Sequence, residues 1–457
     1  MPMNDGVLNR LPEFALACAC CRWPPSSERT ETIQASAALV TDWNRFLRIV
    51  NCHRIAGLVH HALASSEIDV PSHVADGLAL SAGQIARQNL AMAAESARLQ
   101  EIFDDAQIPV VFVKGVSLAQ LAYGSLSLKH GKDIDLLVTP SAILTSLRLL
   151  EQEGYALSHP AAHLGQAQRN AVIRYAKEFG LLRQRDNSEV ELRWRLTDNP
   201  LLLTGIDANS PTQEVPLGGG CGVRTLRNGD LFAYICAHGA RHAWSRLKWL
   251  VDLNAFIAGM SDDDIERLYR NAAARGAGLC AGQALLLREA LLGRSPPPAL
   301  AAELRHSRRI KRLVALGTDA MVGSDAETEI YDRPFATTRI ALGGFGLGRG
   351  AKYYWRQCHV AFVNLEDVIG FRLPERLHFI YPVLRLPLWL WRRIIYRGRN
   401  RGRSHGSQPA GKGSLSSNLM GEIIRRQPIA EPHLPRDATR QTSHPEGAAE
   451  RPGLRAL

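Results

Sequence analysis

Apolar residues in the first hundred positions recur with helical spacing. Between residues 32 and 65 they fall every three or four positions, which predicts amphipathic helices with one face in a core. Residues 73–106 are rich in Ala and Gln and contain no proline, so they predict one or two long helices. We therefore expect an all-helical N-terminal region over residues 1–105.

A different pattern begins at Pro109. An apolar run over residues 109–113 ends at Lys114-Gly115, and a short helix-like segment covers residues 116–123. Residues 133–138 are then rich in branched apolar side chains, which is typical of a buried strand.

A hairpin is predicted farther along the chain. Residues 178–184 and 189–196 alternate between apolar and polar positions, and Asp-Asn-Ser separates them as a turn. One face of the second strand carries Val190, Leu192 and Trp194, and the other carries Glu189, Glu191 and Arg193. The fold class predicted is α+β, with a small mixed sheet over residues 106–200 embedded in mostly helical regions.

The pattern after residue 200 is helical again. Residues 211–221 form a turn-rich stretch that we interpret as a loop, and a helix is predicted to begin near Asn228. His238 and His242 share one face of that helix. The zincin Glu does not follow His238, so we favour packing or nucleotide contact over a metal site. A helical domain is expected over residues 201–370.

The remaining chain divides into a basic segment at 371–403 and a tail at 404–457 that we expect to be disordered. Residues 385–403 hold seven arginines and no acidic residue, interleaved with Trp and Ile. Three interpretations stay open: packing on the domain, peripheral contact with an anionic membrane, and nucleic-acid binding. We favour packing, with membrane contact second.

Composition narrows the class of protein. The 457 residues are 46% hydrophobic and 22% charged, which is typical of a soluble globular protein. The net charge of +11 favours polyanionic partners such as nucleotides. Eight scattered cysteines without disulfide spacing, and no stretch long enough to span a membrane, lead us to expect a cytoplasmic protein, with peripheral membrane contact as the alternative.

Candidate chemistry centres on Asp133 and Asp135. Alternation along a strand points both carboxylates the same way, and their repulsion calls for a cation between them. Oxygen ligands favour Mg²⁺ or Mn²⁺. Gly124-Ser125, just upstream, suits a turn that holds a phosphate. Because Asp-x-Asp alone more often opens a strand or caps a turn, the purely structural interpretation stands beside the functional one.

The whole phrase is more specific than its parts. The stretch contains Lys-Gly, then a short helix ending in Tyr, then Gly-Ser, and then Asp-Ile-Asp-Leu-Leu-Val. This order resembles the signature of the polymerase-beta-like nucleotidyltransferase superfamily, and most closely its bacterial branch of uncharacterised nucleotidyltransferases. The resemblance extends over about residues 30–395. It implies a third carboxylate on a later strand, for which Glu191 aligns best and Glu189 is second. Arg193 stands where a His is usual in that family.

The resemblance implies a Mg²⁺-dependent transfer of a nucleoside monophosphate from an NTP, ATP among the candidates, to a hydroxyl. Asp133, Asp135 and Glu191 are the expected catalytic and metal-binding residues. Gly124, Ser125, Lys114 and Lys129 are expected to hold the triphosphate, with Lys132 ranked below Lys129.

The acceptor is left open by the sequence, and surface-polysaccharide metabolism is one role that a membrane-peripheral enzyme would suit. Two alternatives from other classes remain. One is a nucleotide-binding or regulatory protein that keeps the fold without turnover. The other is a nucleotidyl-transferring toxin that acts on RNA or protein.

Overall fold

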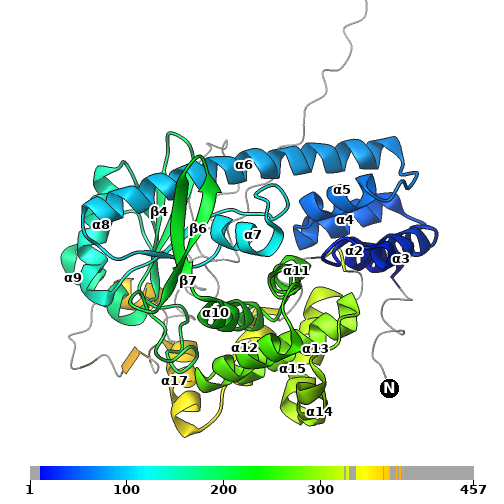
Figure 1. Cartoon of the computed structure of the whole chain (residues 1–457). Coiled ribbons are helices and arrows are strands. Elements are labelled where there is room, and N and C mark those ends of the chain that lie inside the picture. The colour runs from blue at the N-terminus through cyan, green and yellow to red at the C-terminus, as the bar shows by residue number, and fades with distance from the viewer. Residues whose placement is uncertain are drawn as a thin grey trace, which may run out of the picture. The chain divides into compact units, whose positions relative to one another are not determined.

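The computed structural model describes residues 11–323, 326–328, 336–363, 365–370, 377, 380, 381 and 384. Helices surround a small mixed sheet, which confirms the predicted α+β class (Figure 1). The basic segment at 385–403 and the tail at 404–457 lie outside the described residues. Among the helices described, none is long and apolar enough to cross a membrane.

The chain before the sheet is helical, as predicted. Its helices are α2 (Pro12–Cys20), α3 (Ser27–Ala37), α4 (Trp43–His53), α5 (Ala56–Ala64) and α6 (Ser72–Asp105). The 34 residues of α6 form one helix, about 51 Å long at 1.5 Å per residue. It runs along the top of Figure 1, from the sheet to the N-terminal helices.

The main sheet contains β1 (Val111–Phe112), β2 (Ile134–Leu137), β3 (Ala156–His159), β4 (Glu178–Arg183) and β5 (Ser188–Arg193). Its strand order is β1-β2-β5-β4-β3. The predicted hairpin is present, because β4 and β5 pair antiparallel. The pair β2–β5 is parallel, and the other neighbouring strands are antiparallel. The helical elements between these strands are α7 (Val116–Tyr123), η1 (Pro140–Ala142), α8 (Ile143–Gln152) and α9 (Gln166–Tyr175).

A second hairpin stands where the sequence predicted a loop, so that prediction was wrong. Strands β6 (Thr212–Gly218) and β7 (Cys221–Leu226) pair antiparallel, with Val215 opposite Val223 and both side chains buried. Gly218, Gly219 and Gly220 all have positive φ and make the turn. Pro216 and the polar residues of β6 gave a weak strand signal, and packing of the two valines decides the structure.

Helices again make up the chain after the second hairpin. They are α10 (Asn228–Arg241), α11 (Leu247–Phe256), α12 (Asp262–Ala274), α13 (Gly278–Leu292), α14 (Pro298–His306), α15 (Arg308–Met321), α16 (Ala336–Gly344), α17 (Ala351–Phe362) and α18 (Leu365–Gly370).

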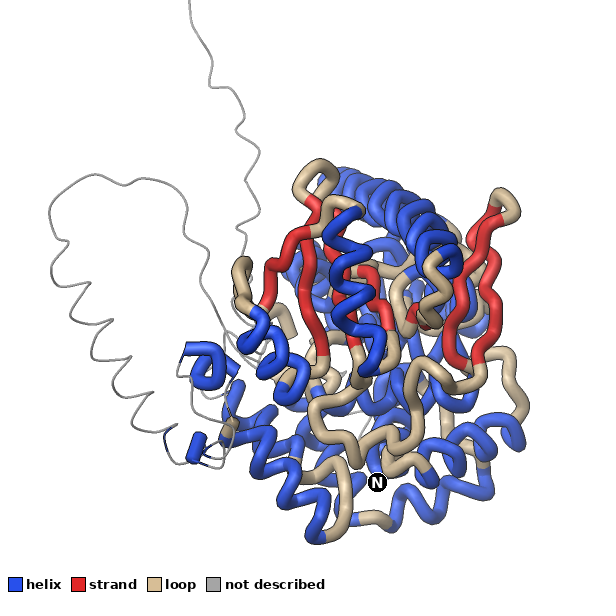
Figure 2. Tube along the Cα trace, turned by 90° about the vertical axis from the view of Figure 1, so that its left-hand side faces the viewer, coloured by secondary structure: helices blue, strands red, loops and turns tan. Residues whose placement is uncertain are grey.

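The main sheet separates two apolar cores, and Figure 2 shows its strands with helices packed around them. Ile134 and Leu136 of β2 belong to one core, together with residues of α6, α8 and α9. Leu137 belongs to the other core, which includes residues of α10, α11 and α13. Because side chains alternate along β2, Asp135 points to the same side as Leu137, toward the C-terminal helices.

Candidate active site

Three carboxylates meet at the parallel pair of strands. The register of β2 and β5 places Asp135 opposite Glu191, and neighbouring strands lie about 4.8 Å apart. Asp133 precedes β2 and points to the same face. One side-chain oxygen from each of the three residues lies within 4.8 Å of the other two. The structure therefore brings together the three carboxylates that the sequence singled out.

Two cations offset part of the negative charge of this cluster. The Nζ of Lys114, which follows β1, lies 3.1 Å from Asp133 Oδ2 and 2.8 Å from Asp135 Oδ2. The Nε of Arg193 lies 2.8 Å from Asp135 Oδ1, and its Nη2 forms an ion pair with Glu191. Lys114 thus stands among the carboxylates, beside the expected metal ligands.

A fourth carboxylate, Glu178, was missed by the sequence reasoning. Its Oε2 accepts a hydrogen bond from Lys177 at 2.8 Å and lies 3.0 Å from Arg193 Nη2. The register of the hairpin pairs Glu178 with Arg193. That register was the available signal, because residues paired across two antiparallel strands have adjacent side chains.

Burial and the neighbouring cations set the charge of each carboxyl. Burial raises the pKa of Asp135 to about 7, although Lys114 and Arg193 oppose this. For Asp133, burial also acts to raise the pKa, but Lys114 and Arg193 outweigh it and the pKa lies below the ordinary value. The pKa of Glu178 falls to about 2, because Arg193 and Lys177 outweigh its burial.

The donor set fits a divalent cation. The side chain of Asp135 is fully buried, and neither of its oxygens accepts a hydrogen bond from the described residues. Lys114 and Arg193 approach these oxygens closely, yet without the alignment of a hydrogen bond. A buried carboxylate oxygen without such a partner is costly, and a metal ion would satisfy it. Carboxylate oxygens are the ligands that Mg²⁺ and Mn²⁺ prefer.

Gly124 and Ser125 lie away from this cluster. Gly124 caps the C-terminal end of α7 in the left-handed conformation, with φ 62°, whereas Lys114 lies just before the N-terminal end. A helix of eight residues separates the two ends by about 12 Å. Ser125 Oγ lies 2.9 Å from Ser127 Oγ and accepts a hydrogen bond from the Ser127 N–H. Phosphate binding by this turn stays a prediction.

The two other lysines have partners outside the carboxylate cluster. Lys129 is buried, and its Nζ lies 3.5 Å from Asp252 Oδ2 of α11. Tyr123 donates a hydrogen bond of 2.9 Å to the other oxygen of Asp252. The more exposed Lys132 donates a hydrogen bond of 3.1 Å to Glu189. The second-ranked carboxylate, Glu189, therefore forms an ion pair with Lys132.

Four basic side chains gather around Lys129, and the sequence reasoning missed them because they come from three segments that lie far apart in the chain. They are Arg54, His130, Arg246 and Lys248. Burial, followed by the charges of the other four, lowers the pKa of His130 to about 3. Burial and three of the same neighbours lower the pKa of Lys248 well below its ordinary value. This basic cluster creates a local potential that attracts polyanions such as a triphosphate.

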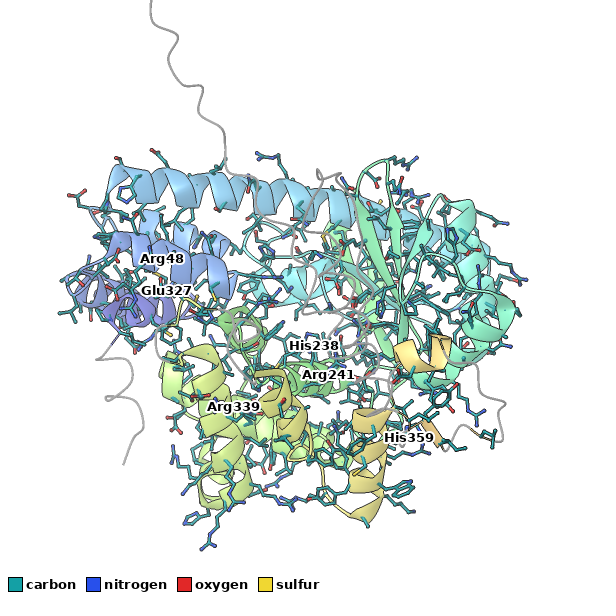
Figure 3. The ribbon with its side chains drawn as sticks, turned by 180° about the vertical axis from the view of Figure 1, so that it is seen from behind. Arg48, His238, Arg241, Glu327, Arg339 and His359 are labelled. Carbon is teal, nitrogen blue, oxygen red and sulfur yellow. The ribbon has the colours of Figure 1, made fainter. Side chains whose placement is uncertain are left out.

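An aromatic group lies within electrostatic range of both clusters. His242 stacks on Trp249 with ring centroids 5.0 Å apart, and His238 lies 4.9 Å from His242. Figure 3 labels His238 and Arg241, both on α10, and Arg241 pairs with Asp198. Burial, followed by the charge of Arg241 and then by cations from both clusters, lowers the pKa of His242 well below its ordinary value, and burial has the same effect on His238. The two histidines are therefore neutral at pH 7.

The comparison with protein families agrees with this geometry. Residues 40–293 match the family described as uncharacterised nucleotidyltransferase. The chain belongs to this family. The match includes all strands of both sheets and the helices from α4 to α13. It ends at residue 293, whereas the resemblance in the sequence extends to about residue 395. A comparison with curated proteins gives no significant match.

Proposed function

We propose that this chain is a metal-dependent nucleotidyltransferase that moves a nucleoside monophosphate from an NTP to an acceptor hydroxyl. The observation that carries the proposal is the register of two parallel strands, which sets Asp135 beside Glu191 with Asp133 at the same face. Membership of a nucleotidyltransferase family supports the reaction class. Metal-assisted phosphoryl chemistry needs such a convergence of carboxylates.

Asp133, Asp135 and Glu191 would hold Mg²⁺ or Mn²⁺. When bound, the metal supplies positive charge to the attacking and leaving oxygens. The acceptor oxygen forms a bond to the α-phosphorus, and the bond from that phosphorus to the bridging oxygen breaks. Pyrophosphate leaves with the electron pair, and the hydroxyl proton passes to solvent.

The chain's own cations have separate tasks in this scheme. Lys114 is 19% exposed at its side chain, and both of its carboxylate partners are metal ligands. Once those carboxylates hold a metal ion, the ammonium group is free to turn toward the triphosphate. The basic cluster around Lys129 would attract the β- and γ-phosphates, which suits the excess of positive charge there.

A second candidate function is nucleotide binding without turnover. The observation that favours it is Arg193, whose guanidinium contacts two of the three carboxylates. A permanent cation at this place competes with metal ions for the same oxygens.

One experiment separates the two functions. Each labelled NTP is incubated with the protein, Mg²⁺ or Mn²⁺ and a cell extract, and label that enters larger molecules is identified by mass spectrometry. We expect transfer by the native protein and none by the variant carrying Asp133→Asn and Asp135→Asn, with the same circular dichroism spectrum for both. Binding of NTP without transfer by the native protein would favour the second candidate. Transfer by the double variant at the native rate would contradict the site assignment.

A further inference from the structure

Arg193 lies at the Glu191 end of the carboxylate cluster, and Lys114 lies at the Asp133 end. Arg193 contacts Asp135 and Glu191, the two carboxylates paired across β2 and β5. Its ion pairs are with Asp135, Glu191 and Glu178, and Asp133 is not among them. Each of two cations therefore bridges two of the three clustered carboxylates. Lys114 pairs with Asp133 and Asp135, and Arg193 pairs with Asp135 and Glu191.

Arg193 has no easy way to leave this position. Its side chain is 2% exposed, and the alternation of β5 directs it to the same face as Glu191. Its Nη2, which also pairs with Glu191, lies 3.0 Å from Oε2 of Glu178, a carboxylate that is not one of the three clustered ligands. A guanidinium also keeps its charge at every pH at which the protein is folded. Turning it away would break three buried ion pairs at once, with Asp135, Glu178 and Glu191, and breaking a buried ion pair is costly.

Lys114 differs from Arg193 in each of these respects. Its side chain is 19% exposed against 2% for Arg193. Both recorded ion-pair partners of Lys114 are clustered ligands, so a metal ion bound there takes over its role completely. An ammonium group on a flexible stem is also easier to reorient than a planar guanidinium with several partners. A metal ion can therefore replace Lys114 but not Arg193.

The charge of the site leads to the same conclusion. Four carboxylates, Asp133, Asp135, Glu178 and Glu191, face three side-chain cations, Lys114, Lys177 and Arg193. The formal excess is one negative charge. Without bound triphosphate, one divalent cation changes this to one positive charge, and a second would raise it to three in a buried site, where repulsion between like charges is strong.

We propose that Arg193 takes the place of a second metal ion, so that the site holds one divalent cation, on the Asp133 side, and the guanidinium supplies the positive charge on the acceptor side. This proposal rests on the proposed function and specifies its metal requirement. Arg193 would donate N–H bonds to the acceptor oxygen as negative charge develops there, which is how fixed donors stabilise a transition state.

The test counts bound metal ions. Native protein is titrated with Mn²⁺, and free Mn²⁺ is measured by its electron paramagnetic resonance signal, without nucleotide. The variant Arg193→Gln removes the guanidinium. The matched control Lys177→Gln removes the same charge from the same cluster, but Lys177 contacts Glu178 and none of the three clustered ligands. Circular dichroism reports whether each variant is folded.

We expect one Mn²⁺ per chain for the native protein and for Lys177→Gln, and two for Arg193→Gln. Two ions on the native protein, one on Arg193→Gln, or two on Lys177→Gln would each overturn the role of Arg193. If Arg193→Gln does not fold, Arg193→Met replaces it, and the native stoichiometry still decides. Native protein that binds no Mn²⁺ would instead contradict the proposed function itself.

Discussion

Two buried arginines stand on the β4–β5 hairpin, and their surroundings differ. Arg183 ends β4 and is 4% exposed at its side chain, and Arg193 ends β5 and is 2% exposed. Both are surrounded by carboxylates. Arg183 pairs with Glu95 of α6 at 2.8 Å and with Asp186 of the turn at 2.7 Å, and its guanidinium lies 4.8 Å from the centre of the Tyr155 ring.

The two surroundings differ in whether the carboxylate oxygens around each arginine accept hydrogen bonds. Glu95 Oε1 accepts hydrogen bonds from Arg98 and Tyr155, and Glu95 Oε2 accepts one from Arg98 and is paired with Arg183. Both oxygens of Asp135, by contrast, receive no aligned hydrogen bond from the described residues. A network whose acceptors are satisfied holds a structure together, whereas a buried acceptor left without a bond is available to a ligand. The same residue type in one hairpin thus serves two purposes.

The largest effect that would sharpen this contrast concerns Glu191 and Glu189. Glu191→Gln should remove a metal ligand. Loss of a residue that only supports a metal ligand costs about 10- to 100-fold in activity, so we expect the rate of nucleotidyl transfer to fall by more than this. Glu189→Gln should change the rate by less than about threefold, because Glu189 pairs with the exposed Lys132. Initial rates with the acceptor found in the labelling screen check this. The reverse outcome would mean that the register of β5 is shifted by one residue pair.

A large effect on stability, without an effect on metal binding, is expected at Glu95. Glu95→Gln leaves buried Arg183 with a weaker set of partners, and breaking a buried ion pair costs about 3–5 kcal/mol. Urea unfolding measures the loss, and Mn²⁺ titration should give the native stoichiometry. The control is Glu151→Gln, which breaks the more exposed pair with Arg169 and should cost less than about 1 kcal/mol. Loss of Mn²⁺ binding in Glu95→Gln would erase the distinction between the two networks.

The smallest effect is a pH dependence of stability on the active-site side, which the network around Arg183 should lack. Burial lowers the pKa of His238 and of His242 well below the value in the unfolded chain. As the pH falls through about 6.5, the unfolded chain protonates these two histidines and the folded chain does not, so their contribution lowers stability on acidification. Asp135, whose pKa is raised to about 7, contributes in the opposite direction. Each histidine contributes up to about 1.4 kcal/mol per pH unit below 6.5.

Urea unfolding at pH 7.5 and at pH 5.5 measures this slope. The variant with His238→Asn and His242→Asn should show a smaller difference between the two pH values. The pKa of Glu95 is lowered, because its hydrogen bonds from Arg98, Arg183 and Tyr155 outweigh its burial. That carboxylate therefore stays ionised over this range. An unchanged slope in the double histidine variant would assign the acid sensitivity to another part of the fold.

The difference between prediction and structure follows from the range of the interactions involved. Alternation along β2 and β5 is local, so the common face of Asp133 and Asp135, and of Glu191 and Arg193, could be predicted from the order of residues. The β4–β5 hairpin could be predicted for the same reason, since its turn and both strands are contiguous. The β6–β7 hairpin has a weaker alternation and was missed.

Only the tertiary structure decided which strands are neighbours. The parallel pairing of β2 with β5 joins segments separated by helices α8 and α9 and strands β3 and β4, and no local pattern indicates the partner of a strand. That pairing sets Asp135 beside Glu191, brings Arg193 between them and adds Glu178 from β4. The basic cluster around Lys129 likewise comes from segments far apart in the chain. Residue types and their faces were determined by the sequence itself, while their distances depend on long-range packing of the two cores against the sheet.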